Sequence, residues 1–373
     1  MTEVEYSTQD FFDEIAKQEK EEQEMEDSNE SPPSDIVAYN ELRSGADFFR
    51  MYEEKDLVIK PDFQRDVVWN SNDQTRFIDS LIKQLPIPSM CFAYDAKHNE
   101  WIVIDGLQRI STIIRFLGCE DWKLSKLMDV DEILHNQKPI TFKNANPRTE
   151  LRKVFQKVQN QTIPVNVLRC DFTKKSHNEY LFTIFHRLNS GGIKLNNQEI
   201  RNCIYSGTFN QMLRDLDLNP DWRLINNLKE KENYRFAKQE AILRFFAFHY
   251  TRDQYNGSIS KFLNNYMADY RHAEQSCIDR HTSLFNRVVS VLSTKILTER
   301  PVSRFPNTII ETTMIGIASN LEHLEEAPEA HCKSLFSKLR SHESISQANL
   351  AEGLSKKEKV ASRLNASIDI FSE

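Results

Sequence analysis

The sequence is poor in glycine and has no paired cysteines. Only 9 of its 373 residues are Gly, which excludes collagen-like and glycine-rich low-complexity chains. Its 6 cysteines are scattered without a Cys-x-x-Cys pair, which argues against a zinc site or a disulfide framework and favours a reducing compartment. We interpret all of them as buried thiols. They are Cys91, Cys119, Cys170, Cys203, Cys277 and Cys332.

Long apolar runs are also missing. No stretch reaches the roughly 18 apolar residues that would span a bilayer. The acidic N-terminus lacks the basic and then apolar order of a signal peptide. With 39% hydrophobic and 28% charged residues, the composition is that of an ordinary soluble globular protein. We therefore expect a cytoplasmic protein, and its length favours two packed units.

The negative charge is concentrated at the N-terminus. The formal net charge is -7, but residues 1–35 alone carry -11, so that the remainder is mildly basic at +4. An acidic, polar segment of this kind cannot bury enough surface to offset its ordering entropy. We expect residues 1–35 to form a mobile or weakly helical acidic arm. Such an arm could be a solvated leader, or it could mimic a nucleic acid or dock a partner.

Hydrophobic periodicity separates two further parts of the chain. Residues 36–205 combine short apolar runs typical of strands with helical stripes, whereas no convincing strand follows residue 206. The pattern predicts an α+β fold, with a helical domain at residues 206–373. Residues 119–160 are charged and irregular and are interpreted as an insertion with short helices. The expected strands are 57–59, 90–94, 101–104 and 162–170, and the expected helices include 77–85, 110–117 and 176–188.

The strongest candidate site is the strand-to-helix turn at residues 105–112. A strand that runs directly into a helix N-terminus presents free backbone N–H groups, which favour phosphate or another anion. Arg109 could bind a phosphate bidentately, while Ser111 and Thr112 add hydroxyl groups. Asp105 could hold a divalent cation or orient an attacking water. Alternatively, Asp105 caps the helix and Arg109 forms a surface ion pair.

Two other polar strings accompany this turn. Gln64 and Arg65 follow the first expected strand, and residues 187–192 form a glycine-bearing corner ahead of Arg201. Each string alone is equally consistent with loop solvation or helix capping. The complete set, in chain order, is Phe63-Gln64-Arg65 with Trp69, Ile78-Asp79-Ser80-Leu81 with Pro86-Ile87-Pro88, Ile104-Asp105-Gly106-x-Gln108-Arg109-x-Ser111-Thr112, Phe185 to Gly192, Leu195 with Glu199-Ile200-Arg201, and Tyr255-Asn256-Gly257 to Met267.

These strings resemble the N-terminal module of GmrSD-type restriction proteins, over about residues 38–275. The resemblance implies a ParB-like α+β domain, related to the ParB/sulfiredoxin fold, at residues 36–205. The family's Asp-Gly-Gln-Gln-Arg motif is associated with binding and hydrolysis of a nucleoside triphosphate. Its members act in bacterial anti-phage defence against phages with modified DNA. Leu107 stands where the motif has its first Gln.

The resemblance also implies the site. Asp105, Gln108 and Arg109 would be catalytic, with Asp105 also binding the metal, and Gln108 positioning the attacking water. The implied cofactors are Mg²⁺ and a nucleoside triphosphate whose base the sequence does not identify. The implied partners are DNA and possibly a separate nuclease subunit. The implied nucleotide-binding residues are Gln64, Arg65, Gly106, Ser111, Thr112, Asn189, Ser190 and Arg201.

One feature of DNA-cutting family members is not found in the sequence. They usually carry a C-terminal nuclease domain of the His-Asn-His type, and the nearest string here, Glu322-His323-Leu324, lies in a helical stretch. The sequence therefore predicts a nucleotide-hydrolysing module of a DNA restriction system rather than a self-contained nuclease. Two alternatives stay open: direct DNA nicking by the same cluster, as proposed for ParB-like nucleases, and a non-catalytic adaptor that binds DNA or protein. Since a charge of +4 is weak for broad DNA binding, any DNA contact should be confined to a patch.

Overall fold

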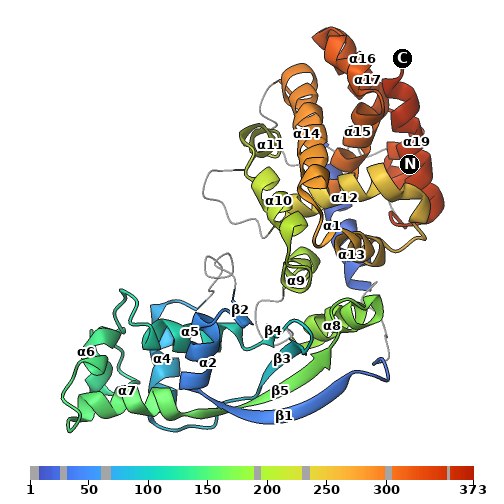
Figure 1. Ribbon diagram of the computed structural model, residues 1–373. Coiled ribbons are helices and arrows are strands. Elements are labelled where there is room, and N and C mark those ends of the chain that lie inside the picture. Colours follow the sequence, from blue (N-terminus) through green and yellow to red (C-terminus); the bar gives the residue numbers. More distant parts are fainter. Residues whose placement is uncertain are drawn as a thin grey trace, which may run out of the picture. The chain divides into compact units, whose positions relative to one another are not determined.

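The computed structural model describes residues 8–25, 32–59, 69–188, 195–228, 236–298, 305–350 and 353–373. The chain divides into two units, shown with their element labels in Figure 1. The α+β unit contains residues 30–194, and the helical unit contains residues 1–29 and 195–373. The division at residue 194 falls earlier than the expected boundary at residue 205. Within the described ranges, no helix combines the length and hydrophobicity that a bilayer crossing requires.

A five-stranded mixed sheet forms the centre of the α+β unit. Its strand order is β1-β5-β3-β4-β2, with antiparallel pairing of β1 with β5 and of β3 with β4, and parallel pairing elsewhere. The four expected strands are confirmed, whereas β1 was not predicted. The strands are β1 (Val37–Ser44), β2 (Leu57–Val58), β3 (Met90–Asp95), β4 (Glu100–Asp105) and β5 (Thr162–Cys170).

The burial of the strands follows from their place in the sheet. β3 and β4 lie inside the sheet and are buried along almost their whole length, which explains their continuous apolar runs. In β5, Ile163, Val165 and Val167 are fully buried and alternate with exposed residues. The helices of this unit are α2 (Gly45–Glu53), α4 (Ser71–Ile82), α5 (Leu107–Leu117), α6 (Pro139–Lys143), α7 (Glu150–Asn160) and α8 (Lys175–Leu188), with a 3₁₀ turn at Glu132–Leu134.

Helices α2, α4, α5 and α7 share one hydrophobic core with the sheet. Residues 119–160 are more than a surface insertion, because Val154, Phe155 and Val158 of α7 are buried in that core. Helix α4 begins before the expected helix 77–85. Its N-cap is Asn70, whose side chain accepts hydrogen bonds from the backbone N–H groups of Asn72 and Asp73.

The described residues of the helical unit form helices and no strands, as expected. The capping box of Asn196 and Glu199 is present at the start of α9. Helices α12 and α15 are buried on nearly all sides. The helices are α1 (Thr8–Met25), α9 (Asn197–Ile204), α10 (Thr208–Asp217), α11 (Pro220–Ile225), α12 (Ala237–Thr251), α13 (Ile259–Tyr270), α14 (Gln275–Val291), α15 (Asn307–Ser319), α16 (Leu321–Glu326), α17 (Glu329–Arg340), α18 (Gln347–Leu350) and α19 (Lys357–Phe371), with shorter turns at Arg252–Gln254, Leu292–Ile296 and Glu343–Ile345.

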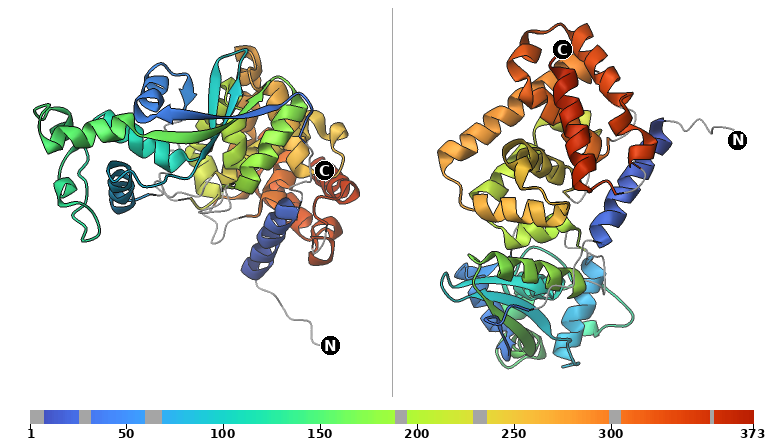
Figure 2. Two further views of the ribbon diagram at one scale, coloured as in Figure 1. Left: turned by 90° about the horizontal axis from the view of Figure 1, so that it is seen from below. Right: turned by 90° about the vertical axis from the view of Figure 1, so that its right-hand side faces the viewer.

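Residues 8–25 of the expected mobile arm form helix α1, which is docked in the helical unit. In both views of Figure 2 this dark blue helix lies beside the orange and red C-terminal helices. Its Phe12 and Ile15 are 4% and 2% exposed, so the acidic segment carries an apolar contact that its average composition conceals. Glu19 accepts hydrogen bonds from the backbone N–H groups of Asn307 and Thr308, at 3.3 and 2.6 Å.

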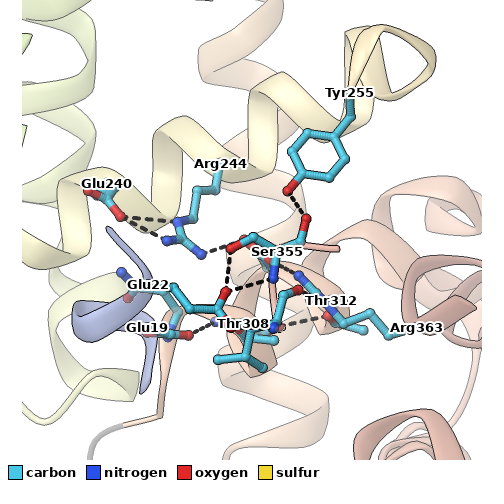
Figure 3. A network of polar contacts seen from close by, with 12 residues as sticks. Glu19, Glu22, Glu240, Arg244, Tyr255, Thr308, Thr312, Ser355 and Arg363 are labelled. Atoms are coloured by element: carbon cyan, nitrogen blue, oxygen red, sulfur yellow. Dashed lines mark hydrogen bonds and ion pairs between the residues drawn. The ribbon is translucent and has the colours of Figure 1, made fainter. Parts of the chain in front are cut away.

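Glu22 makes a second polar attachment of α1, shown in Figure 3. Its carboxylate accepts hydrogen bonds from the backbone N–H groups of Leu354 and Ser355, at 2.7 and 2.9 Å, and from the Ser355 hydroxyl at 2.6 Å. Two of the negatively charged side chains of the segment, Glu19 and Glu22, thus accept hydrogen bonds from backbone N–H groups of the helical unit. Residues 8–25 are therefore a structural element of the helical unit.

A buried network of charges lies inside the helical unit, partly visible in Figure 3. Glu240 accepts hydrogen bonds from Arg201 at 3.0 Å and from Arg244 at 3.1 Å. Glu311 accepts from Arg244 at 3.4 Å and from Arg363 at 2.9 Å. All five side chains are at most 7% exposed. Because each buried charge has an opposite partner, the desolvation cost is offset within the network.

Candidate functional site

The carboxylate at the centre of the candidate site stands at the end of a buried hairpin. Asp105 is the last residue of β4 and pairs with Cys91 of β3. The next pair is Phe92 with Val103, so β4 has one extra residue at this point. A bulge of this kind re-aims the side chains beside it. Asp105 is 35% exposed at its side chain, at the edge of an otherwise buried strand.

Gly106 makes the turn from β4 into α5. Its φ of 98° lies in the left-handed region, which a side chain would disfavour. A Cβ atom at this position would also come within 2.7 Å of the Met90 side chain. Gly106 is the N-cap of α5 and offers no side chain to its first N–H groups. The N-cap residue of α5 therefore adds no carboxylate or hydroxyl group at the positive end of the helix dipole.

Arg109 and Asp105 form an ion pair across the first turn of α5. An Arg109 Nη2–H donates to Asp105 Oδ2 at 2.7 Å, and Arg109 Nη1 donates to the carbonyl oxygens of Pro88 and Ser89. The Arg109 side chain is only 15% exposed. The alternative that Asp105 caps the helix is wrong, because the N-cap residue is Gly106. The surface ion pair proposed in the same alternative is present.

The other residues of the motif take different positions on α5. Gln108 accepts a hydrogen bond from the Trp69 backbone N–H at 3.3 Å, and Ser111 is partly exposed. Thr112 is fully buried, and its hydroxyl donates to the Gln108 carbonyl at 2.7 Å. Thr112 therefore faces the core and stabilises its own helix, which does not fit the expected contact with a nucleotide.

Four of the expected nucleotide-binding residues lie outside the described residues. They are Gln64, Arg65, Asn189 and Ser190. The first described residue after Gln64 and Arg65 is Trp69, which is held by Gln108 and packs on Phe77 with 5.4 Å between the ring centroids. The chain therefore brings the residue that follows this string next to the motif turn.

Arg201 does not reach a surface where it could contact a nucleotide. Its guanidinium is fully buried in the helical unit, where it donates to Asn264 at 2.9 Å and to Glu240 at 3.0 Å. Because buried ion pairs of this kind hold helices together, we assign Arg201 to the interior of the helical unit. This replaces its expected role in the nucleotide site.

The late motif strings are also mainly structural. Phe262 and Tyr266 are buried, and the Tyr255 hydroxyl donates to the Ser355 carbonyl. A surface pocket beside them, which Asn256 and Asp269 help to line, has a volume of about 40 Å³. Pockets for small-molecule ligands are commonly of several hundred Å³, so this one is too small for a nucleotide.

Cys91 is the thiol nearest to the motif carboxylate along the hairpin. Burial and the neighbouring Asp105 carboxylate raise the pKa of Cys91 to about 12, so it stays protonated at neutral pH. All six cysteines are free. Cys91, Cys170 and Cys332 are buried as predicted, whereas the other three are partly exposed.

The donor set at the turn fits only one kind of metal site. Among the described residues there is no group of three His, Cys, Asp or Glu side chains that could hold a metal ion. Asp105 offers a single carboxylate, of which one oxygen already accepts from Arg109. Mg²⁺ commonly binds through one or two carboxylates together with substrate phosphates and water. The single carboxylate at the turn is therefore compatible with a Mg²⁺ ion that is bound together with nucleotide phosphates.

The sequence did not indicate the carbonyl groups that fix Arg109. Pro88 and Ser89 immediately precede β3, and their oxygens accept from the guanidinium. Ser89 in turn accepts a hydrogen bond from Asn166 of β5 at 3.2 Å. Pro88 belongs to the Pro86-Ile87-Pro88 string of the motif set. Backbone acceptors leave no residue-type signal, so only the structure could identify them.

Comparison with known proteins identifies one family. Residues 46–206 match the family model described as GmrSD restriction endonuclease, N-terminal domain. The matched part of the chain includes the motif turn and is similar to this domain, which suggests a role in a restriction system. The strings after residue 206 lie outside the match. No curated protein and no solved structure matches the chain significantly.

Proposed function

We propose that the chain is a nucleotide-binding and nucleotide-hydrolysing module of a DNA restriction and anti-phage defence system. The observation that carries the proposal is the placement of Asp105 and Arg109 around the N-terminus of α5, whose N-cap is a glycine, inside the part of the chain that matches the family model. Free helix N–H groups, a guanidinium and a carboxylate are the groups needed to bind a phosphate chain and its cation.

In this proposal the residues of the turn have separate tasks. Arg109 is fixed by Asp105 and the Pro88 carbonyl, so its remaining N–H donors are held in place to stabilise charge on the transferred phosphoryl group. Asp105 would hold Mg²⁺, which would neutralise phosphate charge when bound. Gln108 lies one residue from Arg109 and would position the attacking water, as far as its bond to Trp69 allows.

A specific observation supports the non-catalytic adaptor as the second candidate. Arg109 is paired within its own unit and only 15% exposed, as expected for an arginine that only joins α5 to the hairpin. Under that alternative the chain would bind DNA or a nuclease subunit without nucleotide turnover. The third possibility, direct nicking by the same cluster, requires the Asp105 carboxylate to act on DNA.

Phosphate release separates these possibilities. The measurement uses ATP, GTP, CTP and UTP with Mg²⁺, with and without duplex DNA, for the wild type, Arg109→Ala and a control. Arg50→Ala is the matched control, because Arg50 also forms an ion pair with a carboxylate four residues away, at the exposed pair with Glu54. Turnover that is lost in Arg109→Ala and kept in Arg50→Ala supports the proposal.

Other outcomes decide against it. Absence of turnover with every nucleotide, in a folded protein, contradicts the proposed hydrolysis. Salt-dependent retention of DNA under those conditions then supports the adaptor. DNA nicking that disappears in Asp105→Ala supports direct cleavage, whereas nicking that survives this substitution comes from another site or a contaminant.

A further inference from the structure

The segment from Lys138 to Asn160 has a charge opposite to that of the whole chain. It holds six basic residues and one acidic residue, a net charge of +5, in a protein whose formal net charge is -7. It comprises α6, the connection at residues 144–149, and α7. Figure 1 shows α6 and this connection at one end of the α+β unit.

The apolar side chains of the segment pack against the core of the α+β unit. Phe142 of α6 and Val154, Phe155 and Val158 of α7 are buried in the core of the unit. Residues 146–150, by contrast, are all exposed. Residues 138–160 therefore form a rigid platform, and the charged groups of its basic residues lie on the side away from the core.

Three of the basic side chains have no carboxylate partner among the described residues. Lys143, Arg148 and Lys157 are exposed and form no ion pair. Lys138 pairs with Asp121, and Lys153 pairs with Glu150, each at 2.6 Å. The only acidic residue of the segment is thus already used, and a positive charge remains on its surface.

Elsewhere in the same unit, more than half of the described basic side chains form an ion pair with a carboxylate, compared with two of the six in the segment. Eight of them outside the segment pair with carboxylates, among them Arg76 with Asp129 and Lys97 with Asp171. Uncompensated charges of one sign repel each other and favour a partner of opposite sign. The concentration of free cations on α6 and α7 is therefore a local feature and does not follow from the composition of the unit.

Arg152 has a different place in the segment. Its guanidinium donates to the Lys143 carbonyl and lies 5.2 Å from the centre of the Phe155 ring. This contact ties the end of α6 to α7 and fixes the spacing between Lys143 and α7. Arg152 is a structural residue of the platform, and we leave it out of the test below.

Amide side chains lie among the free cations. Asn144 and Asn146 are exposed on the connection, and Gln156 and Asn160 are exposed on α7. Such side chains supply hydrogen bonds to phosphate and sugar oxygens in protein–DNA interfaces. Ile140 of α6 is the one large hydrophobic residue of the segment that is exposed, at 40%. The lysine, arginine and amide groups around it match a polyphosphate backbone.

We infer that α6, the connection at residues 144–149, and α7 form a contact surface for the phosphate backbone of duplex DNA. The inference rests on the proposed restriction function for the choice of DNA as the polyanion. A membrane surface fits less well, because an interfacial helix needs a free apolar face, and the apolar face of α7 is buried in the core. Backbone contacts position a protein on DNA without reading its sequence.

The test is DNA binding by the full chain as a function of salt. The variant Lys143→Gln, Arg148→Gln, Lys157→Gln removes the three free charges and touches no buried group. We expect it to bind a labelled 20-base-pair duplex about tenfold more weakly than the wild type, and the salt slope of log K to fall by roughly three. A second duplex of unrelated sequence should show the same loss.

A matched variant controls for overall charge. Lys55→Gln, Arg169→Gln, Lys357→Gln removes the same number of exposed charges outside the segment, at residues with no ion pair among the described residues. An equal loss of DNA binding in both variants, or unchanged affinity in the first, overturns the inference. Phosphate release without DNA, measured on the same samples, should stay at the wild-type rate. Its absence in all of them would contradict the proposed hydrolysis while the DNA result stands by itself.

Discussion

The Arg109 guanidinium donates to the Asp105 carboxylate at 2.7 Å, across the turn that joins β4 to α5. The two residues are four positions apart in the sequence. Asp105 ends strand β4, Arg109 lies in the first turn of helix α5, and Gly106 makes the turn between the two elements. The Pro88 carbonyl accepts from the other arm of the same guanidinium. A single arginine therefore connects the motif carboxylate to the entrance of β3.

This pair should contribute much more to activity than to stability. The pair is partly buried, with the Asp105 side chain 35% and the Arg109 side chain 15% exposed, and ion pairs that solvent still reaches usually contribute about 0.2–1 kcal/mol. We therefore expect the coupling energy for unfolding, from Asp105→Asn, Arg109→Gln and the double variant, to be about 1 kcal/mol or less. Phosphate release should fall at least about 100-fold in each single variant, because removal of one positioned charge-stabilising donor commonly costs that much.

Denaturant unfolding and phosphate release of the same four proteins check this prediction. A fall in activity that only mirrors a loss of folded protein would mean that the pair is structural. Arg109→Lys adds a second comparison, because lysine keeps the charge but loses the planar fork of donors. It should restore little activity.

Gly106→Ala should disturb the turn itself. Alanine at a φ of 98° is strained, and its Cβ would approach the Met90 side chain to 2.7 Å. We expect a loss of about 1–3 kcal/mol in the free energy of unfolding, together with lower nucleotide turnover. Gly118→Ala, at the other end of α5, is the control, since Gly118 has a φ of -70° that alanine adopts readily and its Cβ would come no closer than 3.0 Å to a neighbouring atom, the Ile114 carbonyl oxygen. Its loss should therefore be smaller than that of Gly106→Ala. An equal loss at both positions would contradict the argument.

The sequence predicted the turn but only part of the site. The strand-helix junction was visible from the apolar runs on either side of residues 105–109, and Asp105 and Arg109 do lie together. The prediction for Thr112 was wrong because it rested on the position of Thr112 next to Ser111 in the motif. Along a helix, adjacent side chains point in different directions, and Thr112 faces the core. The prediction for Arg201 was wrong because the order of the motif residues along the chain does not show which of their side chains are buried.

The fold shows a similar limit. Buried strands such as β3 and β5 were predicted because their apolar patterns record burial. The edge strand β1 is exposed along most of its length, and its Val37 and Leu42 are 53% and 69% exposed. A strand held by backbone pairing to one neighbour leaves little pattern in its side chains. Helix α1 was likewise concealed, because two apolar anchors are outweighed by its acidic residues.

The attachment of α1 leads to a prediction for its carboxylates. Glu19→Ala and Glu22→Ala each leave backbone N–H groups of the helical unit without their acceptors. We expect each substitution to lower the free energy of unfolding by about 1–2 kcal/mol. Glu19 matters because Pro306, the N-cap of α15, offers no side-chain acceptor.

Glu21→Ala is the matched control for these two variants. Glu21 lies on the same helix between them and pairs with Lys17 at 3.7 Å, with 53% of its own side chain exposed. Its replacement should change the unfolding free energy by less than about 0.5 kcal/mol. Thermal denaturation of the three variants decides the matter, and equal stabilities would show that α1 contributes nothing through its carboxylates.

Asp217, at the end of α10, should make the free energy of unfolding depend on pH. Its carboxyl group is 4% exposed and accepts a hydrogen bond from the Trp222 indole N–H at 3.3 Å. Burial raises the pKa of Asp217 from 3.8 to about 7. Between these two values the folded state holds a proton that the unfolded state releases. The contribution of Asp217 to stability is therefore lost as the pH rises from about 4 to about 7.

Asp217→Asn removes this dependence, because the amide stays neutral and can still accept from Trp222. We expect the variant to be more stable than the wild type by a few kcal/mol at pH 8, and the difference to shrink toward pH 4. Urea unfolding at pH 4.5 and pH 8 measures it. Asp215→Asn is the control, since Asp215 is exposed and its carboxylate accepts a hydrogen bond from the Gln211 side chain. A difference between wild type and Asp217→Asn that is the same at both pH values would show that the carboxyl group does not titrate in this range.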